Sequence, residues 1–194
     1  PFFFEKDFEL IESAKKTGVD YLGLSFVRDA KDVAQAKQEI AGSDLKLIVK
    51  VETAAALENL DEVLDSADEF LVDRGDLSCD VGIENVEFYQ KHILRKIQEK
   101  GKKSFFATQF LFSMLDKRTP LISETTSLYD AIASGVDGIQ MSEETAIGEN
   151  PNAVLEMIEK IRSCVAKHEF KRHKKSVLWL TGFSGSGKTT FARA

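Results

Sequence analysis

The stretch that decides the fold is Leu-Lys-Leu-Ile-Val-Lys-Val-Glu, residues 45–52. Its nearly continuous apolar character predicts a strand covered on both faces, as in a parallel sheet. Lys50 and Glu52 interrupt the apolar run, and because they are two residues apart their side chains point to the same face. A charge inside such a strand is costly unless it is paired or has a function, so this pair marks a candidate site.

Similar apolar runs recur along the chain and alternate with amphipathic segments. The predicted strands are residues 21–27, 45–51, 69–72, 104–107 and 138–141. The predicted helices are residues 30–40, 54–64, 84–98, 124–134 and 153–165, the first of them capped by Asp29 or Asp32. This alternation indicates an α/β fold of βα units with a parallel sheet. A (β/α)8 barrel and an open doubly wound sheet both fit this pattern.

Polar residues gather where each predicted strand ends. The five groups are Ser25 with Arg28, Lys50 with Glu52, Asp73-Arg74-Gly75-Asp76, Thr108-Gln109 and Ser142-Glu143-Glu144-Thr145. Any one group is explained equally well by helix caps and solvated loop residues. Barrel enzymes hold their chemistry at the carboxyl ends of their strands, so the recurrence of such groups favours the barrel.

Five short motifs carry a family resemblance. They are Leu24-Ser25-Phe26-Val27-Arg28, Val49-Lys50-Val51-Glu52, Arg74-Gly75-Asp76-Leu77, Ala107-Thr108-Gln109 and Met141-Ser142-Glu143-Glu144-Thr145-Ala146. In this order and at these separations they resemble the pyruvate kinase family, over roughly residues 5–165. The resemblance implies a partial (β/α)8 TIM barrel of about five βα units, residues 1–166.

The resemblance also implies roles for individual residues. Lys50 would stabilise charge on the transferred phosphoryl group, and Glu52 and Asp76 would hold a divalent ion, Mg²⁺ or Mn²⁺. Gly75 and Asp76 would offer backbone N–H groups to the substrate carboxylate. Thr108 would contact substrate near the enolate, and Ser142 would lie near the site of enolate protonation. K⁺ is a further cofactor of the family, with most of its ligands outside this chain.

Four positions depart from the family pattern. Glu143 and Ser78 replace glycines, Phe112 replaces a glutamate and Ile122 replaces an arginine. These changes add bulk or remove charge around the expected site while Lys50 and both expected metal ligands remain. They argue against efficient turnover and against the family's usual subunit contacts.

The last residues follow a different pattern. A basic linker at residues 167–175 precedes a predicted strand at 176–181, which runs directly into a complete GxxxxGK[ST] motif. The predicted phosphate-binding residues are Gly182, Ser184, Gly185, Ser186, Gly187, Lys188 and Thr189. A flexible Gly/Ser linker is the alternative. Residues 176–194 resemble the start of adenylylsulfate kinase, which implies ATP as ligand and the first strand and loop of a P-loop kinase domain.

Charge and composition limit the partners and the cellular location that fit this chain. A net charge of −6 argues against nucleic acid as the main partner, and no apolar run is long enough to cross a membrane. Cys79 and Cys164 have no partner at metal-ligand spacing, which fits a reducing cytoplasm. The chain lacks an initiator Met and stops one helical turn after the P-loop, so we expect a fragment of a longer protein.

Three hypotheses follow. The first is a Mg²⁺-dependent phosphotransferase that converts phosphoenolpyruvate and ADP to pyruvate and ATP, fused to a P-loop kinase and homo-oligomeric in its full form. The second is a non-catalytic barrel that serves as scaffold or sensor for the attached adenylylsulfate kinase. The third is a Mg²⁺-dependent keto-acid lyase. Because five strands do not close an eight-stranded barrel, we expect the isolated chain to be inactive.

Overall fold

A computed structural model describes residues 2–172 of the chain, with side chains described to residue 168. Its sheet contains five parallel strands in the order β1-β2-β3-β4-β5. They are β1 (Tyr21–Leu24), β2 (Lys46–Lys50), β3 (Glu69–Asp73), β4 (Lys103–Ala107) and β5 (Gly138–Gln140). The predicted parallel α/β sheet is therefore confirmed.

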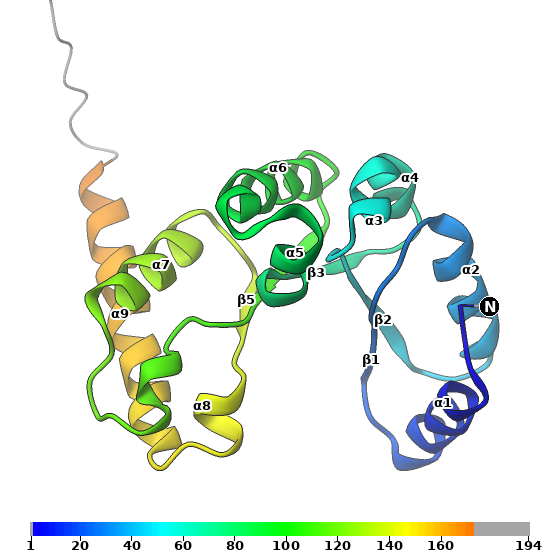
Figure 1. The fold of residues 1–194 in the computed structure, drawn as a ribbon, viewed down its shortest axis with the longest axis horizontal. Helices are drawn as coiled ribbons and strands as arrows, with labels where there is room; N and C mark the ends of the chain where they lie inside the picture. Colours follow the sequence, from blue (N-terminus) through cyan, green and yellow to red (C-terminus); the bar gives the residue numbers. More distant parts are fainter. Residues whose placement is uncertain (1, 173–194) are drawn as a thin grey trace, which may run out of the picture.

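The strand order bears on the two architectures that the sequence left open. Each strand pairs with the next one along the chain, and the order never reverses. A doubly wound sheet has a switch point where the order reverses, whereas a barrel adds strands in sequence. Figure 1 shows the strands following a curve with the larger helices along its outer side. This arrangement is consistent with part of a barrel, and β1 and β5 form its edges.

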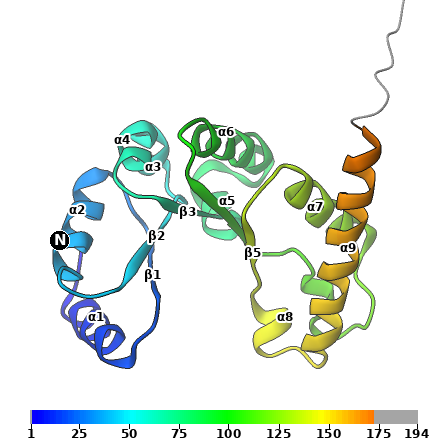
Figure 2. The same cartoon turned by 180° about the vertical axis from the view of Figure 1, so that it is seen from behind.

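Helices connect the strands. They are α1 (Glu5–Thr17), α2 (Ala30–Glu39), α3 (Ala54–Glu58), α4 (Leu60–Asp65), α5 (Arg74–Val81), α6 (Val86–Glu99), α7 (Ile122–Ala133), α8 (Glu143–Ala146) and α9 (Pro151–Arg172), with 3₁₀ turns η1 (Ile83–Asn85) and η2 (Phe112–Leu115). Asp29 caps α2 by accepting hydrogen bonds from the Lys31 and Asp32 amides, as predicted. Seen from behind, α9 lies alongside α7 at one end of the arc (Figure 2).

Most predicted elements shift by one or two residues at their ends, the last helix runs on to Arg172, and two other elements are divided or cut short. The helix expected at 54–64 is divided at Asn59, whose side-chain amide donates to the Ala55 and Arg28 carbonyls, both at 3.1 Å. The strand expected at 21–27 ends at Leu24 because Phe26 has a φ of 55°, outside the extended region. In the first case the Asn59 side chain binds the backbone where the helix would continue. In the second case the Glu52 side chain accepts from the Phe26 amide where the strand would continue.

The hydrophobic core lies between the sheet and the helices. All five residues of β3 are buried, which agrees with a central strand covered on both faces. Phe70 of β3 and Phe106 of β4 pack in one cluster with Ile93 and Ile97 of α6. The parallel pairing of β2 with β3 and of β3 with β4 places their carboxyl ends side by side. Within the described residues, no helix has both the length and the apolar character needed to cross a membrane.

Candidate active site at the carboxyl ends of the strands

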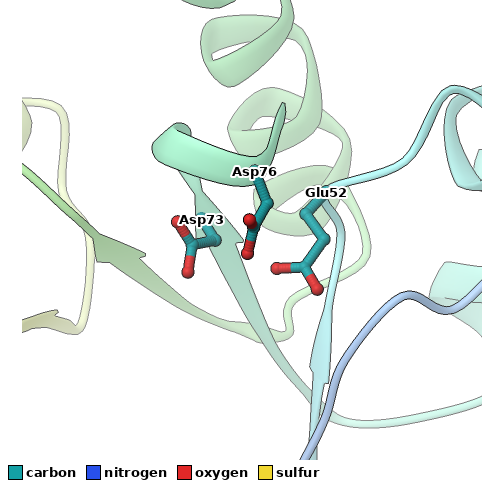
Figure 3. Close-up of side chains that lie close together, drawn as sticks. All are labelled: Glu52, Asp73 and Asp76. Atoms are coloured by element: carbon teal, nitrogen blue, oxygen red, sulfur yellow. The ribbon is translucent and has the colours of Figure 1, made fainter. Parts of the chain in front are cut away.

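Charged residues meet where β2 and β3 end. Lys50 is the last residue of β2 and pairs in register with Leu71 of β3. Asp73, two residues after Leu71, ends β3 close to Lys50. Glu52 follows β2, and Asp76 lies in the first turn of α5 directly after β3. Figure 3 shows the carboxylates of Glu52, Asp73 and Asp76 directed toward a common space.

The Lys50 ammonium lies among these three carboxylates. Its Nζ is 2.9 Å from Glu52 Oε2, 3.1 Å from Asp73 Oδ2 and 3.7 Å from Asp76 Oδ2. Burial alone would lower the pKa of Lys50, but the Glu52 and Asp73 carboxylates outweigh it and raise that pKa above its usual value. The lysine is therefore a fixed positive charge rather than a general base.

Glu52 is the most deeply buried member of the cluster. Its side chain has no exposed surface, and its Oε1 accepts a hydrogen bond of 2.8 Å from the Phe26 amide. Burial raises the pKa of Glu52, against the opposing effects of the Lys50 ammonium and the Phe26 amide. Its Oε2 lies 2.9 Å from the Lys50 ammonium and has no other polar partner among the described residues. A buried carboxylate oxygen of this kind is available to a further cation.

Asp73 is a member that the sequence analysis assigned no role. Its Oδ1 accepts hydrogen bonds from the Gly75 amide at 3.1 Å and from the Thr108 hydroxyl at 2.5 Å. Burial would raise the pKa of Asp73, but the Thr108 hydroxyl and the Lys50 ammonium lower it below its usual value. The available signal was an aspartate at the end of a buried strand, immediately before a helix start.

Thr108 has a strained backbone beside this cluster. Its φ is 76° and that of Gln109 is 57°, and the left-handed region is a genuine outlier for a β-branched residue. Strain of this kind costs about 1–3 kcal/mol and persists where the surroundings enforce it. Here a Cβ on Gly75 would lie 2.9 Å from Thr108 Cγ2, so the close approach requires glycine.

Arg74 binds the segment around Thr108 through that segment's backbone carbonyls. Its guanidinium donates to the Thr108 and Ala107 carbonyls and to Ser127 Oγ, and it lies 3.7 Å from the Phe110 ring centroid. Burial lowers the pKa of Arg74 to about 10, which still leaves it charged near neutral pH. Arg74 is thus a second residue that sequence reasoning left without a role.

Ser142 lies farther along the same edge of the sheet. It precedes α8 after β5, and its amide donates to Glu144 Oε2 at 3.2 Å. Within the described part of the chain, no hydrogen bond joins Ser142 to the Lys50 cluster. The structure therefore brings together Lys50, Glu52, Gly75, Asp76 and Thr108, and leaves Ser142 apart from them.

The departures from the family pattern lie at the surface or within local contacts. Glu143 is exposed, Ile122 is 85% exposed and Phe112 is 47% exposed. Ser78 donates its hydroxyl to the Gly75 carbonyl at 2.6 Å, which ties α5 together behind the cluster. The residues predicted to form a P-loop, 182–189, lie outside the described residues.

The residues present fit a divalent metal ion. One carboxylate oxygen from each of Glu52, Asp73 and Asp76 lies within 4.8 Å of the others. Three carboxylates against one ammonium leave the cluster with an excess of negative charge, which a divalent cation would neutralise. Hard oxygen donors are the ligands that Mg²⁺ and Mn²⁺ prefer.

Comparison with known proteins gives a consistent result. Residues 1–155 match the family described as "Pyruvate kinase, barrel domain". The chain is 42% identical over 158 residues to a pyruvate kinase of Thermococcus litoralis, an alignment that covers 80% of this chain and 33% of the relative. It is 36% identical over 171 residues to that of Thermotoga maritima, covering 87% and 37%. For Methanocaldococcus jannaschii it is 36% over 170 residues, covering 87% and 38%. The chain thus spans little more than a third of these relatives' length.

Proposed function

The chain belongs to the pyruvate kinase family, and on that premise we propose that it carries the metal and lysine corner of a phosphotransfer site. The reaction is transfer of the phosphoryl group of phosphoenolpyruvate to ADP, giving pyruvate and ATP in the cytoplasm. One observation carries the proposal: a half-buried lysine lies within 2.9–3.7 Å of three carboxylates at the carboxyl ends of adjacent strands. Phosphoryl transfer asks the protein mainly for positioning and for compensation of negative charge, and this cluster supplies both.

The proposed roles follow the geometry. Lys50 compensates charge on the phosphoryl group, since its raised pKa keeps it protonated. Glu52 and Asp76 hold the divalent ion, which supplies Lewis-acid polarisation of the substrate oxygens when bound. In this proposal the Gly75 and Asp76 amides at the start of α5 bind the substrate carboxylate, so the Gly75 amide exchanges Asp73 Oδ1, its acceptor in the free protein, for that carboxylate.

Two further roles concern the enolate. Thr108 presents its hydroxyl beside the cluster and contacts substrate near the enolate oxygen. Ser142 is assigned to the protonation of the enolate, a role that the family resemblance supports. Both are supported by their positions directly after β4 and β5.

The proposed domain division places a partial barrel at residues 1–166, a basic linker at 167–175 and the start of an adenylylsulfate-kinase-like domain at 176–194. The observation favouring the last part is the complete P-loop motif at 182–189, preceded by an apolar run of strand character. In that domain Lys188 would reach the terminal phosphates of ATP and Thr189 would bind Mg²⁺. A barrel that acts as scaffold or sensor for this kinase is the second candidate, favoured by Glu143 and Phe112.

A keto-acid lyase that shares the metal-carboxylate site is a third candidate. Such chemistry needs the metal and its ligands and gives no task to a lysine held among the carboxylates. Retention of Lys50 at the centre of the cluster therefore favours phosphotransfer.

The test is a lactate-dehydrogenase-coupled assay of the full-length protein with Mg²⁺, ADP and phosphoenolpyruvate. We expect turnover that requires the metal and falls at least about a thousandfold in Lys50→Met. Lys103→Met is the matched control, because Lys103 also pairs with a buried strand carboxylate, Glu69, but at the opposite end of the sheet. Full-length protein without turnover, combined with adenylylsulfate phosphorylation, would favour the scaffold instead. The isolated 194-residue chain should show no turnover.

A further inference from the structure

Asp73 makes more contacts than its local position requires. It is the N-cap of α5 and accepts a hydrogen bond from the Gly75 amide, as an aspartate before a helix commonly does. Asp29 performs the same task for α2 by accepting from two amides of its own helix. Asp73 differs because it is buried and also contacts side chains from two other strands.

The two carboxylate oxygens of Asp73 have separate partners. Oδ1 accepts from the Thr108 hydroxyl at the end of β4, and Oδ2 lies 3.1 Å from the Lys50 ammonium at the end of β2. A carboxylate on the central strand thus bridges a strand on each side of it. Loss of this bridge would remove a carboxylate that contacts both the Lys50 ammonium and the Thr108 hydroxyl, so their relative position would be less well fixed.

The bridge helps to hold Thr108 in a strained backbone conformation. Thr108 and Gln109 both have positive φ, and Arg74 and Asp73, consecutive in the chain, hold Thr108 by its carbonyl and its hydroxyl. Strained residues of this kind persist where the surrounding structure over-determines them, and they concentrate at functional sites. The Thr108 hydroxyl is therefore set in one direction by Asp73.

We infer that Asp73 is a positioning residue, which fixes the Lys50 ammonium and the Thr108 hydroxyl relative to each other for the transfer step. This inference rests on the proposed function, since it assigns Lys50 and Thr108 the roles given there. Asp73 itself acts through these two side chains. A displacement of about 1 Å in such groups is enough to slow a reaction about a hundredfold.

The experiment separates positioning from helix capping. Asp73→Ser keeps a short acceptor for the Gly75 amide but reaches neither Lys50 nor Thr108. In the full-length protein we expect its kcat to fall about ten- to a hundredfold while KM for phosphoenolpyruvate stays within about threefold. Asp73→Asn keeps an acceptor for Thr108 and should recover part of kcat. The matched cap variant Asp29→Ser should leave kcat unchanged. Equal effects of Asp73→Ser and Asp29→Ser would overturn the inference.

A double-mutant cycle tests whether Asp73 acts through Thr108. Thr108→Val removes the hydroxyl and keeps the branched shape, so adding Asp73→Ser should reduce kcat by less than it does alone, with the loss of the Lys50 contact remaining. Effects that multiply fully would show that the two residues act independently and would contradict the inference.

Hydrogen exchange supplies a readout that needs no turnover. Asp73→Ser should speed amide exchange in a peptide spanning residues 104–110, whereas Asp29→Ser should not. Unchanged exchange there would overturn the positioning role even in an active enzyme. Faster exchange in a protein that turns over no phosphoenolpyruvate would support the contact of Asp73 with Thr108 and would contradict the proposed function. Failure of the inference and failure of the proposed function are therefore distinguishable.

Discussion

Replacement of Lys50 by methionine should make the cluster bind a divalent cation more tightly while it abolishes phosphotransfer. Methionine keeps much of the side-chain volume and removes the ammonium, which now lies within 2.9–3.7 Å of all three carboxylates. A lysine that serves the phosphoryl group competes with the metal for the same oxygens in the free protein. Activity and metal affinity should therefore move in opposite directions.

The magnitude follows from the distances. At an effective dielectric of about 20, each of the three contacts of the Lys50 ammonium corresponds to about 5 kcal/mol of Coulomb attraction. Desolvation of the lysine and repulsion among the carboxylates cancel most of this total. If about a tenth of it remains, the loss of competition amounts to about 1.5 kcal/mol, or roughly tenfold in the dissociation constant.

The assay is a Mn²⁺ titration followed by electron paramagnetic resonance at pH 8. Lys103→Met provides the control, since it removes a lysine from a buried strand carboxylate outside the cluster and should leave Mn²⁺ affinity unchanged. A lower Mn²⁺ affinity in Lys50→Met would refute the reasoning. That result would mean that Lys50 holds the carboxylates in their places, and that the site collapses without it.

Three other predictions concern metal binding and stability. Glu52→Gln and Asp76→Asn should each weaken Mn²⁺ binding at least about tenfold in the same titration, and unchanged affinity in both would remove the proposed metal site. Arg74→Met should lower the free energy of urea unfolding by about 2–4 kcal/mol, because it strips buried carbonyls of their donor; a loss below about 0.5 kcal/mol would contradict this. Burial would raise the pKa of Asp32, but hydrogen bonds from Arg28 lower it overall. The Asp32 carboxylate therefore stabilises the fold above about pH 4, and this stabilisation is lost as the pH falls through the folded-state pKa. Asp32→Asn should therefore cost about 1 kcal/mol at pH 7 and almost nothing near pH 2 in thermal melts, and a difference constant with pH would be inconsistent with this pair.

The central strand β3 was predictable because burial on both faces leaves a direct trace in the sequence. β3 is buried along its whole length and appears as an apolar run, and the charges of Lys50 and Glu52 stand out against such a run. The division at Asn59 was not predictable, because it depends on a carbonyl, that of Arg28, which is distant in the chain. Helical spacing of apolar residues does not report such a contact.

The candidate site divides in the same way. Lys50, Glu52 and Asp76 follow from the charge pattern and the family resemblance, and the structure brings them together. Asp73 was missed because its importance lies in contacts across three strands, and an aspartate before a helix is ordinary in a sequence. The strained backbone of Thr108 was likewise invisible, since threonine gives no sign of a positive φ.

The close approach of Gly75 and Thr108 constrains how this sequence can change over evolutionary time. A methyl group at position 75 would lie 2.9 Å from Thr108 Cγ2, so replacement of the glycine requires Thr108 to shift while that branch is present. Thr108→Ser keeps the hydroxyl and removes the branch, and afterwards a small side chain at position 75 meets one fewer obstacle. Loss of the branch therefore makes the change at position 75 easier: in a collection of relatives, alanine at position 75 should occur with serine or glycine at position 108 more often than with threonine.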